Sequence, residues 1–165
     1  MQEAQTSQQR GERKQVNEAI EHYKRAVSKY EEAIALGLSS ALQIDAMFGL
    51  AESWQNWAEQ ALEVERRLPD NEQSAAVALE ASNTALHLLE QAVLSYRGIL
   101  SLGGGVWTRA DGAVNCANTL TSLAELQPAV AQVETLQEAV SCYRAALTIE
   151  EDAVVRFPPS VSCSE

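Results

Sequence analysis

The chain has 165 residues, about the size of one domain, which is enough to bury a single core without disulfides or metals. It carries 12 Lys and Arg against 23 Asp and Glu, a formal net charge of −11. This charge excludes the basic footprint of a nucleic-acid-binding protein and favours basic partners or none. Gly and Pro are few, and the β-branched and aromatic runs typical of strands are missing. The composition therefore predicts a single all-α domain over 1–165, with a flexible N-terminus at 1–8 and a flexible tail at 158–165.

Five long helices are predicted in chain order, because clusters of Gly and Pro interrupt the apolar periodicity between them. We expect them over residues 8–37, 40–67, 72–102, 107–126 and 130–156. Short connections between such long rods favour antiparallel neighbours. The predicted fold is thus a stack of antiparallel hairpins, in which the second helix pairs with the third and the fourth with the fifth, after one unpaired helix.

The last predicted helix carries two different stripes. One stripe is bulky, and the other consists of alanines that let a neighbouring helix approach closely: Leu136, Val140, Tyr143, Leu147 and Val154, against Ala139, Ala146 and Ala153. A terminal helix of a stack needs a polar outer face. We therefore expect something to cover this helix: the tail, a missing downstream helix, or a second copy of the chain through self-association.

Similar segments recur along the chain at an offset of 66 residues. Residues 26–37 read AVSKYEEAIALG and residues 92–103 read AVLSYRGILSLG, and a third partial copy at 139–150 reads AVSCYRAALTIE. The offset also aligns Glu59 with Glu125. Recurring packing positions should be buried, and these are Tyr30, Ala33, Leu50, Ala51, Trp54, Ala92, Tyr96, Cys116, Ala117, Leu120, Ala139 and Tyr143.

The recurring segments resemble the tetratricopeptide repeat (TPR), a family of helix-turn-helix units that stack into a right-handed solenoid. The second helix of that motif has an alanine, an aromatic four residues later and a small residue three after that, as in Ala26-Tyr30-Ala33 and Ala139-Tyr143-Ala146. The pattern of its first helix is matched in part by Met47-x2-Leu50-Ala51-x2-Trp54. The units resemble degenerate repeats with lengthened helices over roughly residues 16–156. The resemblance implies a short TPR-like solenoid that binds other proteins in a concave groove.

The resemblance also implies which residues line that groove, on the first helix of each hairpin. They are Asp45, Phe48, Glu52, Gln55 and Asn56, then Asp111, Val114, Asn118, Thr121 and Ser122. The set contains three acids and no cation, so a carboxylate ligand would meet like charges. We expect instead a basic or neutral peptide or helix with an apolar anchor near Phe48 and Val114. The alternative is that these residues form only a solvated face.

The usual catalytic and phosphate-binding signatures are absent, including H-E-x-x-H, G-x-x-x-x-G-K-[ST], G-x-S-x-G and G-x-G-x-x-G. Cys116 and Cys142 occupy apolar helix positions and are expected to be small buried hydrophobes. Trp54 and Trp57 are expected in the core rather than in a ligand cage. Trp107 either staples a helix start or anchors a partner, and we favour the staple. We therefore predict a protein that is not an enzyme and holds no metal or cofactor.

The function predicted first is a non-enzymatic scaffold or adaptor that holds a peptide or helix of a partner protein. The alternative is an acidic chaperone for a basic client such as a histone or ribosomal protein, because residues 31–165 carry 6 basic and 19 acidic groups. No nucleic-acid partner and no membrane insertion are expected, since no apolar anchor is visible. The sequence favours a soluble intracellular protein of the cytoplasm and leaves the nucleus and an organelle stroma or matrix open.

Overall fold

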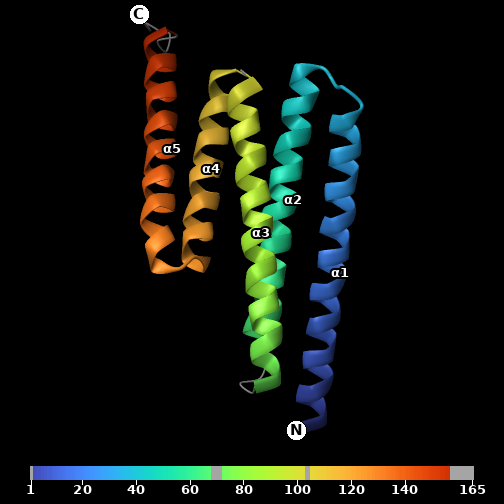
Figure 1. The fold of residues 1–165 in the computed structure, drawn as a ribbon. Coiled ribbons are helices and arrows are strands. Elements are labelled where there is room, and N and C mark those ends of the chain that lie inside the picture. Colours follow the sequence, from blue (N-terminus) through green and yellow to red (C-terminus); the bar gives the residue numbers. More distant parts are fainter. Residues whose placement is uncertain (1, 68–71, 103–104, 157–165) are drawn as a thin grey trace, which may run out of the picture.

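The fold is a row of five antiparallel helices, seen here in a computed structural model that describes residues 2–67, 72–102 and 105–156. The helices are α1 (Gln2–Ala35), α2 (Ser40–Arg66), α3 (Glu72–Leu102), α4 (Val106–Leu126) and α5 (Ala129–Arg156). Within those ranges the structure contains helices and turns and no strand. The helices run alternately up and down, side by side (Figure 1). The predicted all-α stack is confirmed.

The helix ends agree with the prediction to within two residues everywhere except at the start of α1. That helix begins at Gln2, so residues 2–8 are helical where a flexible N-terminus was expected. This segment is rich in Gln, Glu and Ala, which favour helix, and the single Gly11 costs only about 1 kcal/mol relative to alanine. At its other end α1 stops before Gly37, whose φ of 72° suits glycine. The predicted tail at 158–165 lies outside the described residues.

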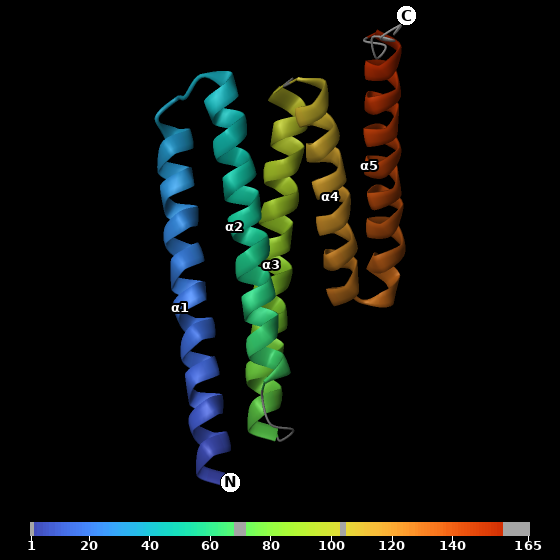
Figure 2. The ribbon, with the colours of Figure 1, turned by 180° about the vertical axis from the view of Figure 1, so that it is seen from behind.

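Each helix packs mainly against its neighbours in sequence, and this includes α1. The expectation that the first helix is unpaired was wrong, because the four residues between Ala35 and Ser40 lay α1 alongside α2. The Tyr30 ring of α1 lies so close to Gly49 of α2 that the methyl group of an alanine at position 49 would overlap the ring. In Figure 1 α3 lies in front of α2 and α4, and Figure 2 shows the row from behind.

Alanine side chains line the contacts between the helices. Six of them have no exposed surface, namely Ala51 and Ala58 of α2, Ala85 and Ala92 of α3, and Ala113 and Ala117 of α4. A small side chain lets two helix backbones approach, and larger neighbours such as Tyr96, Ile99 and Leu120 fill the space beside it. The core is therefore a series of seams between successive helices.

Most of the predicted packing positions lie in these seams. The structure buries Leu50, Ala51, Ala92, Tyr96, Cys116, Ala117, Leu120 and Ala139, and it half-buries Tyr30, Ala33 and Trp54. The prediction was wrong for Tyr143, which is 37% exposed, whereas the matching Tyr96 is 1% exposed. Tyr96 lies on α3, which has a neighbour on each side, whereas Tyr143 lies on α5, which packs mainly against α4.

Replacing Ala117 with leucine should lower the free energy of unfolding by about 1–3 kcal/mol, because the larger side chain would have to fit between helices at a position with no exposed surface. Urea denaturation followed by circular dichroism measures this change. Ala145→Leu on the exposed side of α5 is the matched control and should alter stability little. Equal stabilities for the two variants would contradict the assignment of Ala117 to a tight seam.

Candidate protein-interaction surface

The ten residues predicted to bind a partner lie on one side of α2 and one side of α4. Helical periodicity explains their alignment, since residues seven apart, such as Asp45 and Glu52 or Asp111 and Asn118, lie two turns apart on the same face. Five of the ten are exposed and five are half-buried: Asp45, Glu52, Asp111, Asn118 and Ser122, against Phe48, Gln55, Asn56, Val114 and Thr121.

Phe48 connects three helices and is therefore partly structural. Its ring packs edge-to-face against Tyr96 of α3, with the centroids 6.0 Å apart and the planes at 67°. The tip of the same ring lies against α4, 3.8 Å from where a Cβ on Gly112 would stand. A partner anchored near Phe48 would therefore meet only the part of this side chain that the fold leaves exposed.

Two of the predicted polar residues accept hydrogen bonds from the repeat tyrosines. The Tyr96 hydroxyl donates to Gln55 Oε1 at 2.7 Å, and the Tyr143 hydroxyl donates to Asn118 Oδ1 at 2.5 Å. Burial raises the pKa of Tyr96, and the nearby Glu52 raises it further, so this phenol stays protonated and remains a donor. Gln55 and Asn118 are thus partly engaged inside the fold.

The acidic members of the set have no partner among the described residues. Asp45, Glu52 and Asp111 form no hydrogen bond or ion pair with any part of the chain that the structure describes. Two further exposed acids lie on the same faces and are not among the ten predicted residues, Glu59 on α2 and Glu125 on α4. Each lies one heptad beyond a predicted position, and the 66-residue offset that pairs them was the signal that could have found them.

The two helices that carry this acidic face have few cations. In α2 the first Lys or Arg is Arg66, and both Arg66 and Arg67 pair with Glu63. The hydrogen bond from Arg67 contributes most to lowering the pKa of Glu63. In α4 the sole cation is Arg109, in the first turn. The carboxylates of Asp45, Glu52 and Asp111 are therefore not neutralised by cations of their own helices.

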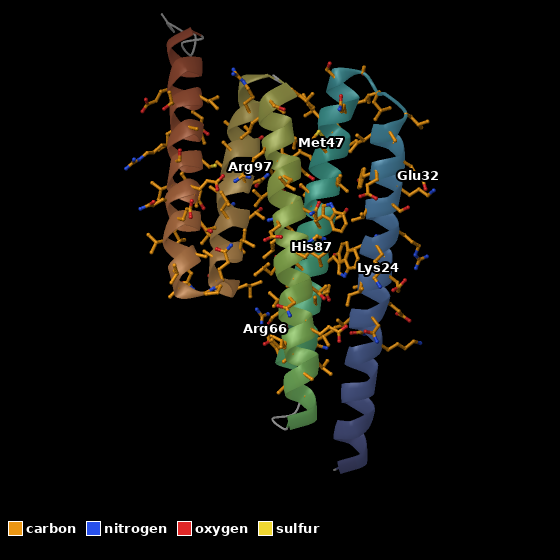
Figure 3. The ribbon with its side chains drawn as sticks, viewed as in Figure 1. Lys24, Glu32, Met47, Arg66, His87 and Arg97 are labelled. Carbon is orange, nitrogen blue, oxygen red and sulfur yellow. The ribbon has the colours of Figure 1, made fainter. Side chains whose placement is uncertain are left out.

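The tryptophan pair belongs mainly to the packing, as expected. Trp54 and Trp57 stack with centroids 5.6 Å apart and planes at 14°, and both rings pack against the core. The Lys24 ammonium of α1 lies 5.4 Å from the centroid of the Trp57 ring, between the two helices (Figure 3). The pair thus joins α1 to α2. The side chain of Trp107, expected to staple a helix start, lies outside the described part of the structure.

The two cysteines with described side chains approach each other where α4 meets α5. Cys116 is fully buried and Cys142 is half-buried, and both are free thiols. Burial raises the pKa of Cys116 to about 12, and the neighbouring Cys142 contributes to the rise. Cys116 therefore remains a neutral thiol and packs as a small hydrophobe, as predicted.

Comparison of the chain with models of known families, with curated proteins and with solved structures found no match. The resemblance to tetratricopeptide repeats therefore stays an interpretation of the sequence. Among the described residues, no helix is both long enough and apolar enough to span a membrane, and no group of three or more His, Cys, Asp or Glu side chains is placed to hold a metal ion.

Removing the Tyr96 hydroxyl should lower stability more than removing the Tyr143 hydroxyl. Tyr96→Phe leaves the half-buried Gln55 without its donor and should cost about 0.5–1.5 kcal/mol. Tyr143→Phe removes a hydrogen bond that water can replace, so its effect should be smaller. Thermal unfolding of the two variants measures the difference, and a larger loss from Tyr143→Phe would contradict the burial described above.

Cys142 should react with iodoacetamide much faster than Cys116 in the folded protein. At pH 8 a thiol with a pKa near 12 is ionised in only about one molecule in 10⁴, and Cys116 is also shielded from reagent. Mass spectrometry of peptides after timed labelling gives both rates, and labelling in urea provides the control in which both sites react. Fast labelling of Cys116 in the native protein would contradict a closed contact between α4 and α5.

Proposed function

We propose that the protein is a non-enzymatic scaffold or adaptor that binds a basic or neutral helix or peptide of a partner protein on the acidic face of α2 and α4. We define this face by the ten predicted residues together with Glu59 and Glu125. The observation that carries the proposal is the set of uncompensated carboxylates on two helices of one stack. The proposed setting is a reducing compartment inside the cell.

The chemistry of this face favours a basic partner. Lysines or arginines of a bound helix would meet Asp45, Glu52 and Asp111, which are exposed and have no partner among the described residues. Carboxylates of an acidic ligand would be repelled by the same groups. The half-buried Phe48 and Val114 add apolar surface between the acids, which suits a helix with an apolar side chain among its cations.

Changing both Asp45 and Asp111 to lysine should weaken a basic partner and slow its association more than its dissociation, because exposed charges act mainly through steering. The probe is an amphipathic helical peptide with leucines on one face and lysines on the other, and its binding is followed by stopped-flow fluorescence anisotropy. The same peptide with glutamates in place of lysines should not bind.

Glu31→Lys with Glu80→Lys is the matched control, since it changes the net charge equally at exposed acids of α1 and α3. This control should reduce association less than the Asp45 and Asp111 pair does. Equal effects would show that only the overall charge matters. Unchanged binding in the Asp45 and Asp111 double variant would place the site elsewhere. A pull-down from native extract with wild type and both variants would then identify the natural partner.

A second candidate function is an acidic chaperone for a basic client such as a histone or ribosomal protein. The supporting observation is that residues 31–165 carry 19 acidic groups and only 6 basic groups. Salt distinguishes the two functions, because attraction between exposed charges is screened over about 8 Å at physiological ionic strength. Binding of a core-histone mixture that disappears when ionic strength rises a few-fold would favour the chaperone, and binding that persists through apolar contacts would favour the scaffold.

A further inference from the structure

The outer face of α5 carries a continuous apolar stripe that no described part of the chain covers. Its side chains are 37% to 93% exposed and occupy successive turns: Val130, Val133, Leu136, Val140, Tyr143 and Leu147. A shallow hollow of about 500 Å³ lies along the middle of the stripe, lined also by Gln137 and Arg144. The alanines Ala139 and Ala146 face α4 instead and are buried. The helix is therefore apolar on two sides, and only one of them packs against another helix in the described residues.

The helix at the opposite end of the row is different. Among the described side chains, the exposed face of α1 carries charged residues that pair with each other along the helix, as Lys14 does with Glu18 and Lys29 with Glu32. A polar outer face is what the terminal element of a stack requires in water. Because α1 has such a face and α5 does not, the part of the row that the structure describes is closed at one end and open at the other.

The side chains of the stripe itself are almost wholly apolar, although Gln137 and Arg144 lie beside them. Tyr143 is the one member with a polar atom, and its hydroxyl already donates to Asn118 of the same chain. Glu138 points away from the stripe and pairs with Arg97 of α3, which is labelled in Figure 3. A second apolar surface could therefore cover the stripe without leaving the Tyr143 hydroxyl unpaired, while Gln137 and Arg144 beside the stripe would keep access to water.

We propose that the stripe binds the same stripe of a second copy of the chain, with the two α5 helices antiparallel. The four central residues Val133, Leu136, Val140 and Tyr143 are spaced by three, four and three positions, which reads the same in both directions. A two-fold axis between Leu136 and Val140 therefore places Val133 against the partner's Tyr143 and Leu136 against the partner's Val140. Such a contact is self-complementary and closes at two copies.

Charge selects the antiparallel orientation. The exposed Glu150 and Glu151 lie near the C-terminal end of the stripe, where no cation of the same turn offsets them. A parallel pair would bring these acids against their equals in the partner. An antiparallel pair places them instead near the N-terminal end of the partner's α5, where the helix dipole is positive. This dimer is independent of the proposed function, because it uses α5 rather than the acidic face of α2 and α4.

Sedimentation equilibrium of the full chain, from about 1 to 100 µM, should show a reversible change from 17.9 kDa to twice that mass. Leu147→Glu should raise the dimer dissociation constant at least tenfold, since it buries a charge in the contact. Leu42→Glu on α2 is the matched control, because Leu42 and Leu147 are 55% and 59% exposed, and it should leave the constant unchanged. Circular dichroism of each variant confirms that the helices are intact.

A charge swap tests the orientation. Val133→Glu and Tyr143→Lys should each weaken the dimer, and the double variant should recover most of the loss, because each introduced glutamate would then face the introduced lysine of the partner. In a parallel pair the double variant would place like charges together and be weaker than either single variant. A mass that stays monomeric at every concentration, or a dimer that Leu147→Glu does not weaken, would overturn the proposal. Binding of a foreign amphipathic helix to a monomeric chain would likewise overturn it and assign the stripe to a heterologous partner.

Discussion

Close approach of neighbouring helices at alanines is the constraint on which the rest of this structure depends. Five long helices joined by short connections can each touch little more than the helix before and the helix after. Their stability must therefore come from narrow seams, and the alanines in these seams, such as Ala51, Ala92 and Ala117, have no exposed surface at all. With the backbones this close, the larger side chains beside them, such as Tyr96 and Leu120, are held in single positions. The seams in this way determine which face of every helix is left for water or for a partner.

The faces that remain differ in chemistry along the row. The outer side of α1 is charged and internally paired, the outer sides of α2 and α4 are acidic and unpaired among the described residues, and the outer side of α5 is apolar. Unpaired acids and uncovered apolar side chains both cost free energy that a bound partner can recover, by charge pairing in one case and by removal from water in the other. The acidic face of α2 and α4 and the apolar face of α5 are therefore suited to different binding partners.

Together the two proposed surfaces would let a dimer bind a partner protein more tightly than a single chain does. The two surfaces meet where Tyr143 donates to Asn118, but the acids Asp45, Glu52 and Asp111 lie on α2 and α4 and are not part of the stripe on α5. A partner with two basic segments on a linker of suitable length would bind the second face at a high effective concentration. Weak binding at each acidic face would then become a firmer attachment.

The sequence by itself determined the all-α class, five helices with nearly correct ends, and the alanine positions, because these depend on local propensity and on the 3.6-residue period. The resemblance to tetratricopeptide repeats implied that Asp45, Glu52 and Asp111 lie on outward faces, and all three are exposed. Only the tertiary structure showed that Phe48 reaches two other helices, that Gln55 and Asn118 accept hydrogen bonds from tyrosines, and that α1 packs on α2. It also showed that Tyr96 is buried and Tyr143 is exposed, although the two occupy equivalent positions in similar segments. A residue pattern specifies which side of a helix is apolar, but burial depends on whether another helix lies there, and that is a property of the whole row.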